Sequence, residues 1–248
     1  MRQLLPDFIE DVDPVALYGA DERSTPADRP WVLVNMIASV DGATAMAQRS
    51  GGLGGPPDRQ VFKALRELPD AIMAGASTVR TEGYGPVRLE DEAVRRRRAR
   101  GQSDTPRLVI LSGSLKLDAT STLFTESEVP PIIVTNASSD EHRRRELEAV
   151  AEVVIAGDER VSMHVALQTM RAMGIRTLLC EGGPIVNAQL VAGDLIDEWC
   201  QTISPLLVGG TSSRAAVGEE GIDPLPHLRL RRLLEQDAML LANYVRSR

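Results

Sequence analysis

The sequence predicts an α/β fold with a mostly parallel central sheet and an antiparallel C-terminal edge. Short apolar runs alternate with segments whose apolar residues recur at helical spacing through most of the chain, which is typical of strand–helix–strand units. Two later apolar runs, 197–203 and 238–246, suit an antiparallel pair at the sheet edge. We expect residues 1–29 to form an N-terminal extension and residues 30–248 a single domain.

Each predicted strand is a mostly apolar run bounded by turn residues, and each predicted helix has apolar residues on one side. The predicted strands are 31–38, 71–75, 107–111, 131–135, 152–156 and 175–180. The predicted helices are 58–68, 141–151, 162–173 and 185–191, with shorter helical turns at 13–17 and 76–80.

Composition excludes several classes of partner. A formal charge of −7 argues against nucleic acid, whose phosphates favour a basic face. Cys180 and Cys200 lie in apolar runs and suit buried thiols, and the three histidines have no metal-ligand spacing, so we expect no metal site. The start of the chain lacks a secretory apolar core and no apolar run reaches bilayer length, which predicts a cytoplasmic protein without membrane contact. The basic run 95–100 could be a nucleic-acid patch, but a solvated helix end facing acids such as those at 90–92 is favoured.

The most informative stretch is Leu178–Val186. An apolar strand ends at Glu181, two glycines and a proline follow, and a helix begins. Glycines let backbone N–H groups approach a phosphate or sugar at a helix N-terminus, and ligands of parallel sheets bind at the carboxyl ends of the strands. The alternative is a tight strand–helix connection with one solvated acid.

Other predicted strands also end in turns with small or hydroxyl residues, at 39–42, 75–80 and 112–114. If these turns converge on one side of the sheet, they form a long cleft. We find no phosphate loop, no dinucleotide fingerprint at the glycine-rich stretch 51–55 and no nucleophile elbow. Such a cleft suits a reaction whose difficult step belongs to a cofactor.

Stretches in the order expected of one family span residues 30–210. They are 30–42, 65–80, Leu179-Cys180-Glu181-Gly182-Gly183-Pro184 and 195–210. Together they resemble the reductase domain of riboflavin biosynthesis, the bacterial RibD C-terminal domain. This resemblance implies a three-layer dihydrofolate-reductase-like fold and NADPH-dependent reduction of a phosphorylated ribosylamino-pyrimidine to its ribitylamino form, by hydride transfer to the sugar C1′.

The resemblance also implies roles for individual residues. The positions that match substrate contacts are Ser50, Arg66, Arg88 and Glu181, and we expect Glu181 and Asp41 to be the catalytic carboxylates. The positions that match cofactor contacts are Ile37, Ala38, Thr78, Glu82, Ser112, Gly182, Gly183, Pro184, Ile185 and Val186. Arginines suit a substrate phosphate, and N–H groups at 183, 185 and 186 suit the cofactor diphosphate.

Each role has a structural alternative. Arg66 could be a surface helix residue, and Thr78 could be a helix N-cap. Asp41 could only set a turn with Gly42. Glu181 could be structural, although a buried carboxylate needs a partner.

The sequence departs from the family pattern at 81–86 and at Gly52, both where substrate is expected. Three functions therefore stay open: the riboflavin-pathway reductase, a reductase of the same fold acting on another pterin or pyrimidine such as dihydrofolate, and a catalytically silent nucleotide-binding relative. The chain lacks the motifs of the zinc deaminase module that usually accompanies this domain. The resemblance and the apolar segment 199–208 predict a homodimer.

Overall fold

The computed structural model describes residues 1–46, 49–218 and 225–247. Its chain contacts define two compact units. The first comprises Met1–Ser24, Trp31–Arg66 and Leu179–Arg248, and the second Thr25–Pro30 and Glu67–Leu178. The expectation of one domain over residues 30–248 stays a prediction.

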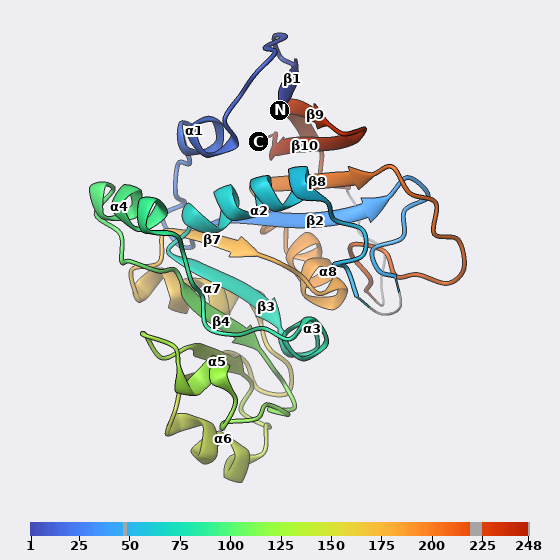
Figure 1. The fold of residues 1–248 in the computed structure, drawn as a ribbon. Coiled ribbons are helices and arrows are strands. Elements are labelled where there is room, and N and C mark those ends of the chain that lie inside the picture. Colours follow the sequence, from blue (N-terminus) through green and yellow to red (C-terminus); the bar gives the residue numbers. More distant parts are fainter. Residues whose placement is uncertain (47–48, 219–224, 248) are drawn as a thin grey trace. The chain divides into compact units, whose positions relative to one another are not determined.

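The strands of the first unit lie in the order β1-β9-β10-β8-β2-β7 (Figure 1), with β7 belonging to this unit from Leu179 on. Strand β8 runs parallel to β2 and antiparallel to β10, so the expected antiparallel pairing is confirmed. The expected antiparallel C-terminal edge is confirmed, and it extends beyond the predicted pair, because β9 pairs with β10 and β1 pairs with β9. An arginine pair and a leucine pair at 231–234 break the alternation of apolar and charged residues in β9, which hides its strand pattern. The bounds are β1 Arg2–Leu5, β2 Trp31–Ser39, β7 Thr177–Cys180, β8 Glu198–Ser204, β9 Leu228–Gln236 and β10 Met239–Arg246.

The helices described in this unit are α1 (Pro14–Gly19), α2 (Pro56–Glu67) and α8 (Pro184–Ala192). Helix α2 lies along β2 and β8 (Figure 1) and buries Val61 and Leu65. Helix α8 begins with Pro184 in its first turn, as the sequence predicts, where a missing N–H group costs no hydrogen bond.

Residues 1–24 of the N-terminal extension are part of the first unit rather than an appendage. The Arg23 guanidinium donates to both carboxylate oxygens of Glu198, at 2.8 and 3.1 Å, and the Glu198 side chain is fully buried. Arg232 donates to the Asp21 carboxylate in the same way. These buried ion pairs hold the segment before β2 against β8 and β9, because an unpartnered charge there would be costly.

The second unit contains the parallel strands β3-β4-β5-β6, in register from Ala71 opposite Arg107 onward. The predicted parallel pairing of the strands is confirmed for this unit. The sequence indicates α4 only as a helix end at 95–100, and it does not indicate α5. No helix in the described ranges is long and apolar enough to cross a bilayer. The bounds are β3 Ala71–Gly75, β4 Arg107–Leu111, β5 Ile132–Thr135, β6 Glu152–Ile155, α3 Ala76–Glu82, α4 Asp91–Ala99, α5 Thr122–Thr125, α6 Glu141–Glu148 and α7 Met163–Ala172.

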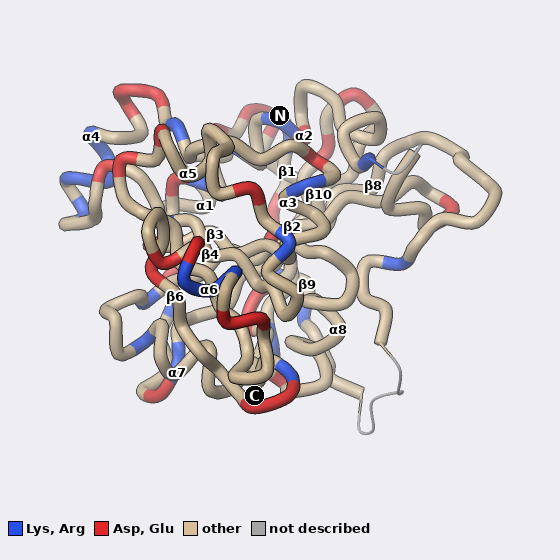
Figure 2. Tube along the Cα trace, turned by 90° about the horizontal axis from the view of Figure 1, so that it is seen from below, with Lys and Arg blue, Asp and Glu red and all other residues tan. Residues whose placement is uncertain are grey.

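The arginine run lies at the end of α4, after two acidic residues in its first turn (Figure 2). Arg97 is fully buried and donates to the carbonyl oxygens of Glu67, Pro69 and Ser103. Arg96 forms two 2.8 Å bonds to the Glu67 carboxylate. The run therefore faces the chain's own acids, as expected, but Glu67 is the main partner, whereas Glu92 lies 3.6–3.7 Å from its arginines.

Candidate active site

The carboxyl-terminal half of β2 is the first component of the site in the first unit. Val32 to Val34 are buried, whereas Met36, Ile37 and Ala38 are only half buried although β2 lies between two other strands. A central strand normally has both faces covered. Its partial exposure at this end leaves room for a bound molecule.

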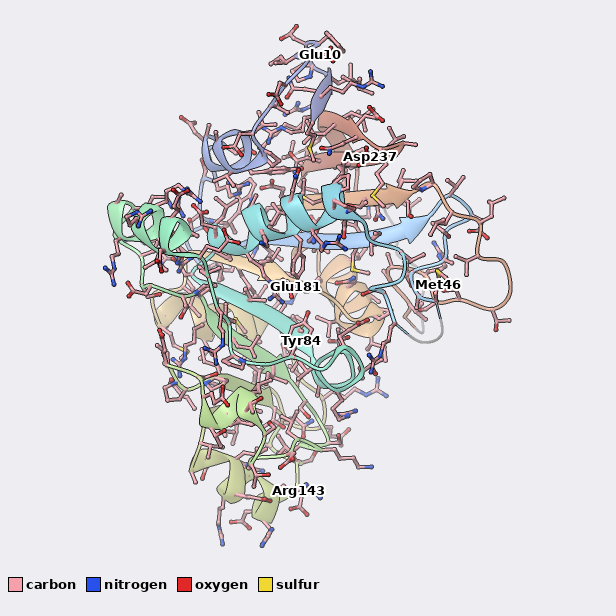
Figure 3. The ribbon with its side chains drawn as sticks, in the orientation of Figure 1. Glu10, Met46, Tyr84, Arg143, Glu181 and Asp237 are labelled. Atoms are coloured by element: carbon pink, nitrogen blue, oxygen red, sulfur yellow. The ribbon has the colours of Figure 1, made fainter. Side chains whose placement is uncertain are left out.

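Glu181 follows β7 directly and forms an ion pair with Arg66 of α2. Both carboxylate oxygens accept from the guanidinium, at 2.7 Å each, and the Glu181 side chain is only 3% exposed against 25% for Arg66. The guanidinium also lies 4.3 Å from the centre of the Phe62 ring. Figure 3 labels Glu181 at the end of β7, on the side of α2. Arg66 is thus no plain surface residue: it neutralises the buried carboxylate and keeps part of its surface open to solvent.

The turn after Glu181 fits the diphosphate of a dinucleotide. Gly183 is the N-cap of α8 and supplies no side-chain cap, so no cap side chain occupies the N–H groups of the first turn, including those of Ile185 and Val186. Gly182 has a φ of +91°, which favours glycine, and a Cβ there would lie 3.4 Å from the Met36 sulfur. The Ile185 side chain is exposed.

Asn187 supports this turn and was missed by the sequence analysis. Its fully buried side chain donates to the Ala215 carbonyl at 2.7 Å and accepts from the Cys180 thiol. The signal available in the sequence was one amide in an otherwise apolar helical turn. Burial raises the pKa of Cys180 to about 12, so the thiol beside Glu181 stays neutral.

Asp41 lies in the turn after β2, where its carboxylate binds its own surroundings. It accepts from the Ser39 hydroxyl and from the backbone N–H groups of Val208 and Gly209, the latter at 2.7 Å. These bonds, that from Ser39 foremost, lower the pKa of Asp41 to about 2. The geometry favours the turn-setting alternative, with the carboxylate joining two loops, and makes Asp41 a poor proton donor at neutral pH.

Ser50 is half buried in the loop before α2, and its carbonyl accepts from the Leu53 N–H group. The structure therefore places Ser50, Asp41, the β2 positions Ile37 and Ala38, the Arg66–Glu181 pair and the turn 182–186 in the first unit.

The remaining predicted residues lie in the second unit. Thr78 is the third residue of α3, whose N-cap is Gly75, so the N-cap alternative for Thr78 is wrong. Glu82 ends the same helix. Ser112 is buried after β4, and its hydroxyl accepts from the Leu115 N–H group at 3.0 Å. Arg88 is exposed and pairs with Glu126 at 2.8 Å.

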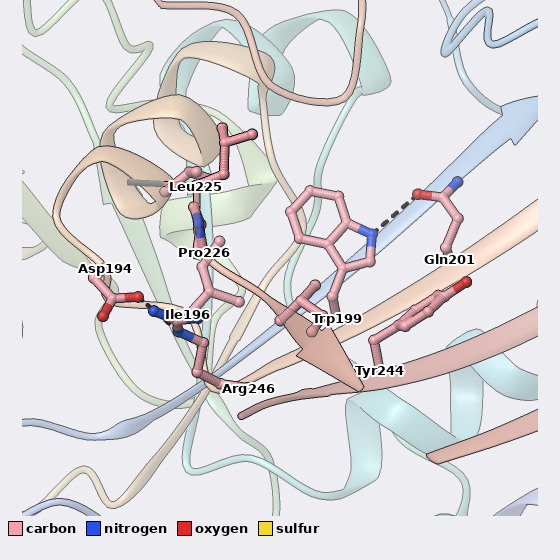
Figure 4. Close-up of a pocket in the computed structure, with 10 residues that line it drawn as sticks. Asp194, Ile196, Trp199, Gln201, Leu225, Pro226, Tyr244 and Arg246 are labelled. Atoms are coloured by element: carbon pink, nitrogen blue, oxygen red, sulfur yellow. Dashed lines mark hydrogen bonds and ion pairs between the residues drawn. The ribbon is translucent and has the colours of Figure 1, made fainter. Parts of the chain in front are cut away.

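The first unit also has an apolar cavity of about 500 Å³ on β8 and β10. Trp199 and Tyr244 come from neighbouring strands and stand beside each other in it (Figure 4). Trp199 donates to Gln201 at 3.0 Å, and Arg246 pairs with Asp194 at 2.8 Å. No pattern in the sequence indicates this cavity.

These features define the class: an α/β protein with a dinucleotide-type glycine turn at the carboxyl end of a parallel strand and a forked arginine–glutamate pair beside it. The particular family follows from comparison with known proteins. The RibD C-terminal domain matches residues 30–240, and the chain belongs to this family.

Several known proteins are similar to this chain over most of its length. A 2,5-diamino-6-ribosylamino-4(3H)-pyrimidinone 5′-phosphate reductase of Methanothermobacter thermautotrophicus is 33% identical over 198 residues, covering 79% of this chain and 88% of that protein. The Aquifex aeolicus protein of the same name is 30% identical, covering 82% and 91%. A crystal structure of a pyrimidine reductase-like protein from Corynebacterium diphtheriae superposes with a TM-score of 0.86 at 27% identity, covering 96% and 100%. The fold is shared with Acinetobacter baumannii RibD, with a TM-score of 0.70 at 21% identity, covering 89% of this chain and 59% of that one.

Proposed function

We propose that the protein is an NADPH-dependent reductase of a ribosylamino-pyrimidine 5′-phosphate in riboflavin biosynthesis. The observation that carries the proposal is the buried Arg66–Glu181 pair beside the glycine turn, in a chain that is 33% identical to a reductase named for such a substrate. Bound nicotinamide would supply a hydride to the sugar C1′. Substrate and one proton enter with the reduced cofactor, and the ribitylamino product leaves with the oxidised one.

The residues of this chain bind and orient. Glu181, held by Arg66, accepts hydrogen bonds from sugar or pyrimidine donors, and the part of Arg66 open to solvent attracts the substrate phosphate. Arg88 is a further phosphate contact in this proposal. The N–H groups at 183, 185 and 186 hold the cofactor diphosphate. Ile37, Ala38, Thr78, Glu82 and Ser112 are proposed as further cofactor contacts.

NADPH oxidation followed at 340 nm tests the function. The assay uses a panel of the phosphorylated diamino-ribosylamino-pyrimidinone, its deaminated uracil counterpart and dihydrofolate. We expect turnover with a ribosylamino-pyrimidine phosphate and tighter binding of NADPH than of NADH. Turnover of dihydrofolate alone would move the protein to the second function left open by the sequence. NADPH binding without any turnover would make it a silent relative, and no binding would overturn the proposal.

We also propose a homodimer, formed through the sheet face that bears the apolar cavity. Trp199 and Tyr244 are half buried on this face, and a second copy would cover them. Tyr244→Glu should give a monomer by sedimentation velocity at micromolar concentration. Phe8→Glu, at an exposed apolar residue outside the cavity, is the matched control and should leave the dimer intact. A monomeric wild-type protein would overturn the proposal.

A cytoplasmic location completes the proposed function. Both cysteines are free thiols, as is usual for proteins kept in a reducing compartment. Recovery of the protein in the membrane or secreted fraction of its cells would contradict this location.

A further inference from the structure

Helix α2 presents a row of side chains to the sheet. One end of this row is Arg66, which binds Glu181, and the other end is a further carboxylate, Asp58. Asp58, Phe62 and Arg66 follow one another at intervals of four residues, so they share one face of the helix. Arg66 reaches Glu181 and covers Phe62. At 1.5 Å per residue, Asp58 lies about 12 Å from Arg66 along the helix axis. The same face that holds Glu181 therefore presents Asp58 two turns away.

The Asp58 carboxylate is fixed by groups outside its own helix. It accepts a hydrogen bond from the Thr202 hydroxyl of β8. Its Oδ2 atom lies against the backbone of Gly54, where an added Cβ would be only 2.8 Å away. Thr202 is paired in register with Ile37 of β2, and residues paired in this way project on the same face of a sheet. The carboxylate thus lies beside the half-buried end of β2.

Burial, and not a neighbouring charge, shifts the Asp58 carboxyl toward its protonated form. Burial raises the pKa of Asp58, and the Thr202 hydrogen bond and the neighbouring Arg59 only partly offset this effect. Two turns along the helix, the positive charge of Arg66 is matched by Glu181. On β8, the residues at two-residue spacing from Thr202 are Cys200 and Ser204, and beyond them Glu198 is held by Arg23. Burial also raises the pKa of the Cys200 thiol, which stays neutral.

We infer that Asp58 is the catalytic acid of the proposed reduction, giving its proton to the sugar ring oxygen. As the bond from C1′ to the ring oxygen breaks, its electron pair goes to the oxygen, which takes the Asp58 proton and becomes a hydroxyl. The amino nitrogen that joins the pyrimidine to the sugar uses its lone pair to form a double bond to C1′. Hydride addition at C1′ then returns this lone pair to the nitrogen. Asp58 regains a proton from water, so each turnover consumes one proton. This role rests on the proposed function.

Asp58→Asn tests the role, because asparagine keeps the size of the side chain and an oxygen for Thr202. We expect kcat at neutral pH to fall by about 10²- to 10⁴-fold, the usual contribution of a general acid, with NADPH affinity unchanged. The alkaline decline of kcat with a pKa above that of an ordinary aspartate should also disappear. Asp91→Asn is the matched control, since Asp91 is an aspartate in the first turn of α4, and it should retain wild-type kcat.

A stability measurement gives a readout independent of turnover. An acid whose folded-state pKa is raised above 3.8 destabilises the fold as pH rises from 3.8 through the folded pKa. Asp58→Asn should therefore unfold at higher urea concentration than wild type at pH 7–8, and the difference should vanish near pH 4. Wild-type kcat and pH profile in the variant, or an unchanged midpoint at pH 8, would overturn the role of Asp58. An inactive wild-type enzyme would instead overturn the function on which this role rests.

Discussion

Removal of the Arg66 guanidinium should have a large effect on stability and substrate binding together. Arg66→Ala leaves the Glu181 carboxylate, which is 3% exposed, without its forked partner. Breaking a buried pair costs about 3–5 kcal/mol, and because the Arg66 side chain is 25% exposed we expect a value near the lower end, about 3 kcal/mol. At roughly 2–4 °C per kcal/mol for a chain of this size, the melting temperature should fall by about 6–12 °C.

Calorimetry and urea unfolding measure this loss directly. Arg88→Ala is the matched control, since both partners of the Arg88–Glu126 pair are at least half exposed and such pairs contribute little. The double variant Arg66→Ala with Glu181→Gln should recover part of the loss, because it removes the stranded charge. In the folded variant, the KM for the phosphorylated pyrimidine should rise about ten- to a hundred-fold while NADPH affinity stays near normal. A variant with wild-type stability and KM would refute the reasoning.

Three further predictions concern other parts of the chain. Gly183→Val should fold but should no longer bind NADPH when titrated with it, because the valine side chain would keep the cofactor away from the backbone N–H groups of the turn. An unchanged affinity would show that the turn has only a structural role. Arg97→Met removes hydrogen bonds to three carbonyl oxygens and should lower the urea midpoint strongly, whereas Arg95→Met at the exposed face of α4 should not. Since hydrogen bonds lower the pKa of Asp41 to about 2, its stabilisation is present above pH 3.8 and is lost as pH falls toward 2. Asp41→Asn should therefore lower stability at pH 7 but not at pH 2, and it should retain most of the wild-type kcat. A large loss of kcat without a loss of stability would instead make Asp41 a catalytic residue.

The sequence alone determined the strand–helix alternation, the parallel core and the family. Apolar runs such as 71–75 and 107–111 are local signals, and the stretch Glu181–Pro184 carries its turn chemistry in consecutive residues. Local composition could not reveal β9, whose residue pairs at 231–234 break the alternation typical of a strand. It could not reveal β1 either, which is a strand because β9 lies beside it.

Tertiary structure decided which polar side chains meet. Arg66 and Glu181 are distant in sequence, and only the packing of α2 against the end of β7 makes one the counter-charge of the other. The packing of α2 on the sheet also brings the Asp58 carboxylate into hydrogen-bond contact with the Thr202 hydroxyl. The Asp41 carboxylate instead accepts a hydrogen bond from the backbone N–H group of Gly209. A carboxylate's protonation depends on burial and partners, which the order of residues does not encode locally. The sequence therefore named Glu181 and Asp41, whereas only the fold pointed to Asp58 and distinguished the roles of the three acids.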